Sequence, residues 1–512
     1  MNWKRYKALS PKEKRDETYY IIGLDIGNES SALAFFNLHE NTPEPIDLSG
    51  GYGKPSIPTV MQYITETKEW VFGEYAILNQ GSGTEITLHS MVQRLGQNEY
   101  LDIDNKAVSL VSVLGLFIKE ILSSIRNINP KAEIVGIVAA VQAYMDEAAH
   151  EELRRAFGLA GYEKELIALV PSRECILAHY CGGNFEEEEQ VLVLDYGSRE
   201  VRGGLYHMAV NSGAITAKAI SSLFDESVGT EVIWQKVYSL FESHFRSVQK
   251  GTPQHDQLTA FAYQHRDILF QKNIRTKPAK LYYNFVYPPF QQAITHADAE
   301  GLIKPYRQQF TRFIRDMLAK NVYGTAIPTR DIDVVLCTGG GFEMLWAREA
   351  VADIFGNGRS RVFRNAKMVV AEGAAFIAAK LLDIVVSKSI TVEDNHRLSV
   401  DIGLKAGDVF LPLVERDAFW WQVHQPKLIL VNSLVSGDLQ FAVAQRTKSG
   451  DMTELMLHNL IGLPSRPKGT TRLRFGINFI SNSDITINVT DIGFGELFPK
   501  TDYEKEFAVG LK

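Results

Sequence analysis

Apolar residues run in short stretches separated by polar turns, and many of these stretches have the length of a β-strand. The first, YYIIGL, leads into Asp25 and Gly27 and is followed by SSALAFF. The second, QVLVL, leads into Asp195 and Gly197 and is followed by VRGGLYHM. Apolar runs of this length bounded by Gly and polar residues predict strand, tight turn and strand. The chain therefore carries Leu-Asp-x-Gly twice, each time in a predicted hairpin.

Helical periodicity alternates with strand-like runs around these hairpins. Residues 107–125 have the spacing of a buried helix, residues 132–141 favour a buried strand and residues 145–162 favour a helix. Residues 332–355 predict a strand, a Gly-rich turn and a helix that Gly339–Gly341 opens. Residues 165–182 predict a short strand that runs into a helix. Further helical patterns cover much of residues 221–325 and residues 368–382. The alternation predicts the α/β fold class.

The character of the chain changes near residue 386. The polar segment 387–397 predicts a linker or an edge segment, and short strands with turn punctuation follow it to residue 512. Strands at such close spacing predict a separate all-β sandwich, residues 386–512, with no helical lid after it. Residues 1–18 are charged throughout and lack the apolar core of a signal peptide, so we expect a solvated, mobile N-terminal arm.

Composition narrows the class of protein. A chain of 512 residues exceeds a single core, so two to four domains are expected. The net charge of −7 gives no support to nucleic-acid binding, and no apolar stretch is long enough for a membrane span. Three cysteines without a CxxC motif predict neither a disulfide framework nor a zinc site. These features are typical of a cytoplasmic protein.

The two Asp-x-Gly turns suit a nucleotide and its metal ion. A carboxylate at a strand end can hold Mg²⁺ through waters, and glycine in the turn lets backbone N–H groups approach phosphate oxygens. A helix N-terminus after the Gly triplet also favours an anion. Asp25 and Asp195 are the predicted metal-binding residues. The predicted nucleotide-binding residues are Asp25, Gly27, Asn28, Asp195, Gly197, Ser198, Gly339, Gly340 and Gly341.

In the order of these motifs the chain resembles the DnaK-type 70-kDa heat-shock chaperones of the actin-like ATPase superfamily. The similar segments are LDIGNESSALAFF, LDYGSREVRGGLY, DVVLCTGGGFEML, VVAEGAAFIAAKLLDIVV and, in the β-region, LSVDIGLKAGDVFLPLVERDAF. The resemblance implies an actin-like nucleotide-binding domain of two duplicated lobes over residues 19–385. It also implies ATP or ADP with Mg²⁺ as ligand, and an unfolded peptide or a protein client, with co-chaperones, as partners.

Several positions depart from the family pattern. Asn28 and Glu29 stand where the first hairpin has Thr, and Ser198, Arg199 and Glu200 replace Gly-Gly-Thr in the second. A glutamate about 4 Å from a phosphate would cost about 4 kcal/mol at an effective dielectric constant near 20. Gln93 precedes the pair Arg94-Leu95 where the family has its catalytic Lys, Ser172 falls at the family's catalytic Glu, and Glu343 falls near its adenine-packing Arg.

These departures predict ATP hydrolysis that is weak or absent, since losing one transition-state charge stabiliser costs roughly 10²–10³ in rate. Arg94 and Glu174 are candidate substitutes for the lost pair. The alternative is a pseudo-ATPase scaffold with an empty cleft, in which Asp25 and Asp195 only cap turns. A sugar-kinase-like phosphotransferase and a filament-forming actin relative both leave the β-sandwich unexplained.

The resemblance places the first peptide-binding loop of the sandwich at Ala406, Gly407, Val409 and Phe410, with Asp408 between them. Trp420 and Trp421 are adjacent, so in a strand they point to opposite faces and one is available to a ligand or an interface. Without a lid, we expect a bound peptide to exchange faster.

Overall fold

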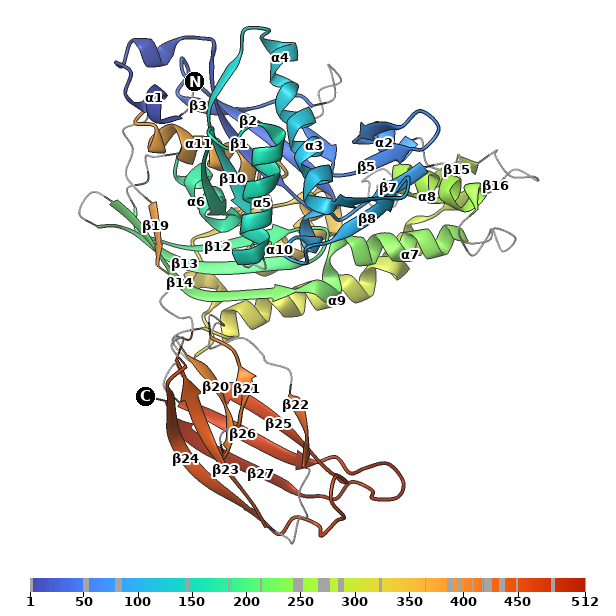
Figure 1. The fold of residues 1–512 in the computed structure, drawn as a ribbon, viewed down its shortest axis with the longest axis vertical. Helices are drawn as coiled ribbons and strands as arrows, with labels where there is room; N and C mark the ends of the chain where they lie inside the picture. Colours follow the sequence, from blue (N-terminus) through green and yellow to red (C-terminus); the bar gives the residue numbers. More distant parts are fainter. Residues whose placement is uncertain are drawn as a thin grey trace.

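The chain folds into a mixed α/β part and, below it in Figure 1, a separate β-sandwich. The computed structural model describes residues 3–511 except 49–54, 79–84, 143–144, 146, 183–184, 186, 212–213, 243–251, 266–276, 284–289, 322–324, 364, 385–389, 394–397, 399, 408, 417, 419–425, 432–437, 448–449 and 480–483. Among the described residues no helix is long and apolar enough to cross a membrane.

The first sheet is centred on β1 (Tyr19–Ile26), which carries Asp25. It pairs antiparallel with β2 (Ser30–Asn37) and parallel with β10 (Glu133–Val141). The sheet order is β11-β10-β1-β2-β3, with β4 also paired to β2. The outer strands are β3 (Thr42–Pro45), β4 (Ser56–Pro58) and β11 (Leu166–Pro171). Helices cover both faces of this sheet, and seven of the eight residues of β1 are buried, so the strand is a continuous apolar run.

The second sheet repeats this order around β12 (Glu189–Tyr196), which carries Asp195. β12 pairs antiparallel with β13 (Val201–Asn211) and parallel with β17 (Val334–Thr338). The full order is β18-β17-β12-β13-β14-β19, with β14 (Ala214–Asp225), β18 (Ser360–Val362) and β19 (Ile390–Glu393). β19 comes from the segment expected to be a linker or an edge, and it is the edge strand. Each Asp therefore ends a strand that lies between a hairpin partner and a parallel neighbour.

Helices separate and cover the two sheets (Figure 1). α3 (Leu110–Ser123) and α5 (Glu147–Ala160) pack on one face of the first sheet. α6 (Ser172–Cys181) and α11 (Val369–Leu381) share one apolar core with both sheets. α7 (Thr230–Glu242), α8 (Pro253–His265), α9 (His296–Ala319) and α10 (Leu345–Phe355) pack on the other side of the second sheet. α6 and α11 thus form a middle layer that both Asp-bearing strands contact.

Smaller elements complete the α/β part. They are α1 (Trp3–Lys7), α2 (Glu74–Leu78), α4 (Ile125–Ile128), the sheet of β5 (Met61–Ile64), β6 (Glu69–Phe72) and β7 (Glu85–Leu88), and the hairpins β8 (Tyr100–Ile103) with β9 (Lys106–Ser109) and β15 (Ala279–Tyr283) with β16 (Phe290–Ile294).

Two helix starts differ from the sequence-based prediction. The helix expected from residue 107 begins at Leu110, because Ser109 ends β9 and its side chain caps the helix by accepting the N–H of Ser112 at 3.2 Å. The helix expected to open at Gly339–Gly341 was also misplaced. Gly340–Glu343 form a 3₁₀ turn, and α10 begins at Leu345. The Gly triplet is therefore a turn before the helix, and the expected helix N-terminus does not lie at it.

The N-terminal segment is not the solvated arm that its charge predicts. Tyr6 is fully buried and its hydroxyl donates to the backbone carbonyl of Lys14 at 2.6 Å. The ammonium groups of Lys7 and Lys14 donate to Leu381 and Leu382 carbonyls, both at 3.0 Å. Cations at the carbonyl end of a helix are favourable, so the segment docks where α11 ends.

The β-sandwich consists of two four-stranded sheets around one apolar core. One sheet has the order β21-β20-β23-β24, with β20 (Asp401–Ala406), β21 (Val409–Val414), β23 (Asp438–Arg446) and β24 (Met452–Ile461). The other has the order β22-β25-β26-β27, with β22 (Lys427–Val431), β25 (Thr471–Phe479), β26 (Asp484–Asp491) and β27 (Glu504–Gly510). Leu223 of β14 packs against this core as well as its own, so the two parts touch there.

Candidate functional site

The first hairpin buries Asp25 beside a lysine. Asp25 is 4% exposed, and its Oδ2 lies 3.6 Å from Nζ of Lys367, which stands just before α11. Oδ1 of Asp25 has no hydrogen-bond partner among the described groups. Burial raises the pKa of Asp25 and Lys367 opposes that rise. The buried carboxyl therefore has a cation of the protein itself beside it, which offsets part of the effect of burial.

The second hairpin holds Asp195 close to the same groups. Burial raises the pKa of Asp195 to about 6, Arg202 and Lys367 lower it, and Asp25 and Glu200 raise it further. Asp25 is among the charges that raise the pKa of Asp195, so the two predicted metal-binding carboxyls lie within electrostatic range of each other. The structure thus brings together the two strand ends that the repeated Asp-x-Gly pattern selected.

The turns that follow the two aspartates are bound to neighbouring elements. The side-chain oxygen of Asn28 accepts the N–H of Gln93 at 2.8 Å. Gly197 donates its N–H to the carbonyl of Glu200 at 3.0 Å. The carbonyls of Gly197 and Ser198 accept the N–H groups of Thr230 and Glu231, at 3.1 and 2.8 Å. The second turn therefore satisfies the first N–H groups of α7, which begins at Thr230.

Polar side chains cross the space between the hairpins. Thr230, at the start of α7, donates its hydroxyl to Glu29 of the first turn at 3.4 Å. Arg202 of β13 forms an ion pair with the buried Glu200, and it donates to the amide oxygen of Gln142 at the end of β10, at 3.2 Å. Both glutamates that the sequence marks as repulsive to phosphate are thus held by contacts within the protein.

Of the two candidate substitutes for the missing catalytic pair, Arg94 is engaged elsewhere. The guanidinium of Arg94 forms an ion pair with Glu99, with Nε 2.8 Å from Oε2. Ser172 donates its hydroxyl to the carbonyl of Val141 at 3.0 Å. Glu174 lies in the first turn of α6, next to Cys175. Burial raises the pKa of the Cys175 thiol, and the charges of Asp25 and Glu174 raise it further. Arg94 is therefore a structural cation of its own loop.

The Gly triplet is explained mainly by packing against the strand that carries Asp195. Gly339 has a φ of 88°, and a Cβ there would lie 2.7 Å from Oδ1 of Asp195. A Cβ on Gly341 would overlap the ring of Tyr196. Gly340 is exposed and has open space around its Cβ position. Glu343 is also exposed, at the end of the 3₁₀ turn. Of the triplet, Gly340 is the residue with room for a ligand.

Lys367 is the site residue that sequence reasoning missed. Its backbone is fixed beside the Gly triplet, because the carbonyl of Ala366 accepts the Thr338 hydroxyl at 2.6 Å and the Gly339 N–H at 3.1 Å. A Cβ on Gly27 would lie 3.2 Å from the Lys367 ammonium, so the side chain lies over the first turn. A lysine before a helix of small residues belongs to no motif that would have identified it.

The expected divalent cation does not fit these residues. Asp25 would be one of its two carboxylates, but the ammonium of Lys367 already lies against that group. Among the described residues, no group of three or more His, Cys, Asp or Glu side chains is placed to hold a metal ion. The two strand-end carboxylates, those of Asp25 and Asp195, thus have protein cations close to them. These cations are Lys367 and Arg202.

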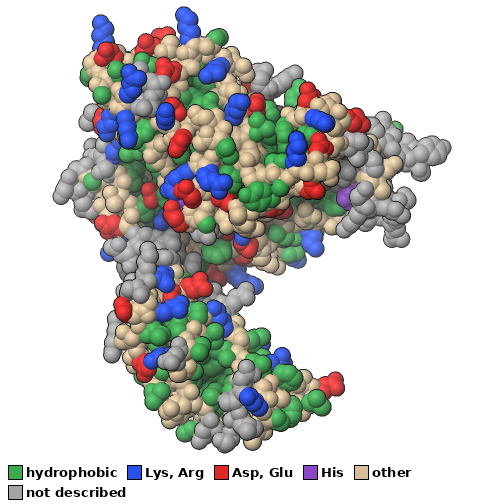
Figure 2. All heavy atoms as spheres, in the orientation of Figure 1, with side chains coloured by type: hydrophobic (Ala, Val, Ile, Leu, Met, Phe, Trp, Pro, Cys, Tyr) green, Lys and Arg blue, Asp and Glu red, His purple; other side chains and the backbone are tan. Residues whose placement is uncertain are grey.

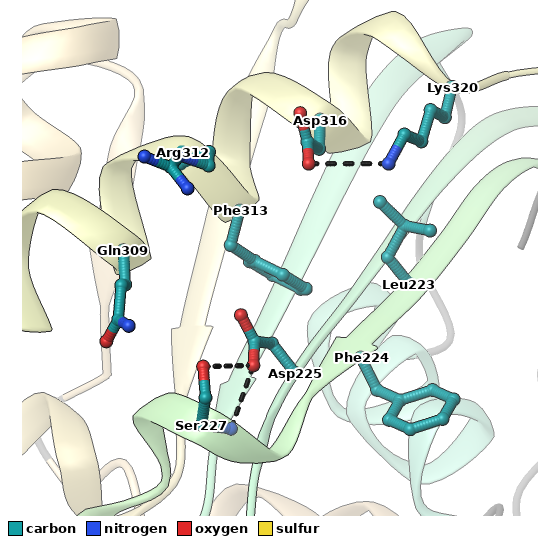
Figure 3. A pocket seen from close by; sticks show the side chains of 9 residues that line it. All are labelled: Leu223, Phe224, Asp225, Ser227, Gln309, Arg312, Phe313, Asp316 and Lys320. Atoms are coloured by element: carbon teal, nitrogen blue, oxygen red, sulfur yellow. Dashed lines mark hydrogen bonds and ion pairs between the residues drawn. The ribbon is translucent and has the colours of Figure 1, made fainter. Parts of the chain in front are cut away.

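A pocket of about 200 Å³ lies elsewhere, between β14 and α9 (Figure 3). Its lining residues are Leu223, Phe224, Asp225, Ser227, Gln309, Arg312, Phe313, Asp316 and Lys320. Lys320 and Asp316 form an ion pair at 3.4 Å, and Asp225 accepts from Ser227. The strand-end aspartates of the candidate site do not line this pocket.

The predicted peptide-binding loop lies at the tip of the β20–β21 hairpin. Ala406 and Gly407 are exposed, and the side chain of Val409 is 68% exposed. Phe410 is half-buried under the guanidinium of Arg446, 4.5 Å from the ring centre. Asp408, Trp420 and Trp421 lie outside the described residues. Val409 is thus the apolar member of this loop that is available to a partner.

Exposed apolar side chains also occur on other strands of the sandwich. Figure 2 shows hydrophobic side chains gathered on the visible face of this part of the molecule. Large apolar residues with at least 38% exposure are Val409 and Leu411 on β21, Leu428 and Leu430 on β22, and Met452, Met456, Leu457 and Ile461 on β24. β21 and β24 are the two edge strands of one sheet and β22 is an edge strand of the other, so these exposed side chains lie on edge strands of both sheets.

Comparison with known proteins gives two short matches and several long ones. A family of unknown function (DUF5716), in its C-terminal part, matches residues 42–224, and a domain of unknown function (DUF8552) matches residues 395–511. The chain is 23% identical over 497 residues to chaperone protein DnaK of Thermosipho africanus, which covers 93% of this chain and 79% of that protein. It is 21% identical over 490 residues to chaperone protein DnaK of Thermotoga maritima, with the same coverage. Low identity over nearly the whole chain supports a distant relationship to DnaK.

Proposed function

We propose that this protein is chaperone-like, with a nucleotide-binding α/β part and a β-sandwich that holds an unfolded peptide or a protein client. The observation that supports the nucleotide part is that Asp25 and Asp195 each lie near the end of the equivalent strand of its sheet, with Asp25 close enough to raise the pKa of Asp195. The actin-like description of the two lobes is part of this proposal, as are a cytoplasmic location and the use of co-chaperones.

Hydrolysis is weak or absent in this proposal. Gln93 and Ser172 stand where the resemblance places the catalytic Lys and Glu, and both are uncharged. Arg94 is paired with Glu99, so this candidate substitute for the catalytic Lys is already engaged. Without these charges the transition state loses two stabilising groups, each worth roughly 10²–10³ in rate.

Titration calorimetry of the full chain with ATP and with ADP tests the nucleotide part. We expect binding with at most a trace of phosphate release over hours. Absence of heat at millimolar nucleotide, with Mg²⁺ and with a chelator, would remove nucleotide binding from the proposal. Steady turnover that Arg94→Ala leaves unchanged but Asp195→Asn abolishes would show that an efficient ATPase exists without the family's Lys and Glu.

The second candidate is a pseudo-ATPase scaffold whose cleft stays closed, and one observation favours it. Glu29 contacts Thr230 across the hairpins, and Glu200 is buried against Arg202, which in turn contacts Gln142. These side chains occupy the turns that would otherwise face phosphate. Replacing Glu29 and Glu200 with threonine separates the candidates, because nucleotide binding that appears only in the double variant identifies a closed cleft in the natural chain.

Polypeptide binding by the sandwich rests on its exposed apolar side chains. Fluorescence anisotropy of a labelled, apolar unfolded peptide measures this directly. We expect Val409→Asp to weaken binding, because it places a charge in the exposed apolar part of the β20–β21 loop. Leu497→Asp is the matched control, since Leu497 is 84% exposed but lies between β26 and β27. Equal effects of the two substitutions would argue against a site at Val409, and slow peptide release would contradict the expected fast exchange.

A further inference from the structure

We propose that the ammonium of Lys367 is the permanent cation of this cleft and takes the place of a divalent metal ion. The consequence for ligands, which rests on the proposed nucleotide site, is that a nucleoside phosphate binds here without Mg²⁺. The strand-end aspartates predict a metal site from the sequence, but in the structure the ammonium of Lys367 lies beside Asp25.

The position of Lys367 is built into the fold. Its neighbour Ala366 is held by two hydrogen bonds from the turn after β17, and Met368 donates its N–H to the carbonyl of Asn365 at 2.8 Å. α11 begins at Val369 and packs between the sheets. The lysine side chain therefore extends from a rigid base toward the first hairpin.

The ammonium lies against the strand-end carboxylate of the first hairpin. It is 3.6 Å from Oδ2 of Asp25, whose side chain is 6% exposed, while that of Lys367 is 21% exposed. It also lies 3.2 Å from the position that a Cβ on Gly27 would take, so it covers the turn after Asp25. A cation held between this carboxylate and its turn occupies the place that a metal ion bound through Asp25 would need.

A divalent ion would have to compete with this lysine. Bringing a second, doubly charged cation to the same buried carboxylate places two like charges within a few ångströms in a poorly solvated space. Arg202 adds a further cation beside Asp195. By contrast, phosphate oxygens need only a donor, and an ammonium on a fixed base supplies three N–H groups. The ligand class that fits is a nucleoside di- or triphosphate free of its metal ion.

Divalent-cation binding to the full chain tests the role of Lys367 without any nucleotide. Free Mn²⁺ is counted by its electron paramagnetic resonance signal for the natural chain, Lys367→Ala and the control Lys405→Ala, whose lysine pairs with Glu454 in the sandwich. We expect Mn²⁺ binding at the strand ends only in Lys367→Ala, with loss of that binding when Asp25→Asn is added. Mn²⁺ bound by the natural chain and lost in Asp25→Asn would overturn the proposal, as would a folded Lys367→Ala variant that binds none.

If Lys367→Ala does not fold, Lys367→Arg serves as a second variant, because it keeps the charge and should keep Mn²⁺ excluded. Mn²⁺ binding by Lys367→Arg at Asp25 would then contradict the proposal.

Nucleotide calorimetry completes the test and keeps the two proposals apart. We expect the affinity of the natural chain for ADP to be the same in Mg²⁺ and in a chelator within about threefold, which is under 1 kcal/mol. A more than tenfold loss of affinity in the chelator would overturn the role of Lys367 while leaving nucleotide binding intact. Absence of ADP binding in both conditions would instead overturn the proposed function, and the Mn²⁺ result would still decide the role of Lys367.

Discussion

Asp25 and Asp195 end equivalent strands of two sheets with the same strand order, and their charges are balanced in different ways. Asp25 faces a lysine that arrives from the segment before α11. Asp195 faces Arg202 on its own hairpin, but Arg202 is already paired with Glu200. Burial is the largest influence on both carboxyls and raises the pKa of each, that of Asp195 to about 6. The difference between the hairpins is the source of the nearby cation, which comes from a distant segment in the first and from the hairpin itself in the second.

The difference shows that a repeated backbone frame does not imply repeated chemistry. The strand, the aspartate and the glycine two residues later are common to both copies. The partner charges come from side chains that are not repeated, namely Lys367 for one copy and Arg202 with Glu200 for the other. Each of the following predictions changes one hairpin and compares it with the other.

The largest effect is expected from exchanging the residues two positions before each aspartate. Gly23 packs so closely on α11 that a Cβ would overlap the carbonyl of Ala371, while Val193 already fills the equivalent place in the second sheet. Gly23→Val should cost more than about 4 kcal/mol of folding free energy, so that little soluble protein forms. Val193→Gly should cost about 3 kcal/mol and still fold. Thermal unfolding and soluble yield measure both, and a stable Gly23→Val variant would show that α11 can shift.

Removing the cation of the first hairpin comes next. Lys367→Met leaves the buried carboxylate of Asp25 without its partner and should cost about 3 kcal/mol of unfolding free energy. Adding Asp25→Asn should recover most of that loss, because no buried charge then remains. Denaturant unfolding of the natural chain, the two single variants and the double variant gives the coupling free energy between Lys367 and Asp25. Strictly additive losses would mean that the pair at 3.6 Å has no energetic coupling.

The second hairpin should respond in the opposite direction. The folded-state pKa of Asp195, about 6, lies above the ordinary value of 3.8, so the folded state holds the proton more tightly and loses stability as the pH rises from about 4 to about 6. Asp195→Asn removes this charge and should gain about 3 kcal/mol at neutral pH, with no gain below about pH 4. Melting temperatures across this range measure it, and a loss at neutral pH would show that the ionised form is favourably held.

The smallest effect concerns the turn glycines. A Cβ on Gly27 would lie 2.7 Å from the carbonyl of Ser30, whereas on Gly197 it would lie 3.4 Å from that of Glu200. Gly27→Ala should therefore cost about 1–2 kcal/mol, and Gly197→Ala less than about 0.5 kcal/mol. Urea unfolding resolves this difference. Equal costs would indicate that the first turn relaxes as readily as the second.

The parts of the structure that local patterns determine could be predicted from the sequence. Apolar runs that end in Asp and Gly located β1 and β12, and the strand runs after residue 386 located the sandwich. Asp25 and Asp195 were placed correctly at strand ends because strand length and turn chemistry are local properties. Asp25 also raises the pKa of Asp195, so the two carboxyls lie within electrostatic range of each other.

What could not be predicted depends on tertiary contacts between distant segments. Lys367 meets Asp25 only because α11 packs on β1, which no local pattern encodes. The docking of the segment around Tyr6 and Lys14 could not be predicted, because its many charged residues favour a solvated arm while Tyr6 is buried. The Gly triplet was read as a helix start, although Gly339 and Gly341 make room for Asp195 and Tyr196.

The docking of the N-terminal segment has a consequence for the order of events during synthesis. Lys14 leaves the ribosome long before its acceptor, the carbonyl of Leu382, which follows 368 residues later. β1 likewise waits for α11, because Gly23 is shaped for that helix. The N-terminal third of the nascent chain therefore stays incompletely covered until α11 emerges. Contacts of such long sequence separation form late, so this stretch needs protection from aggregation while it waits.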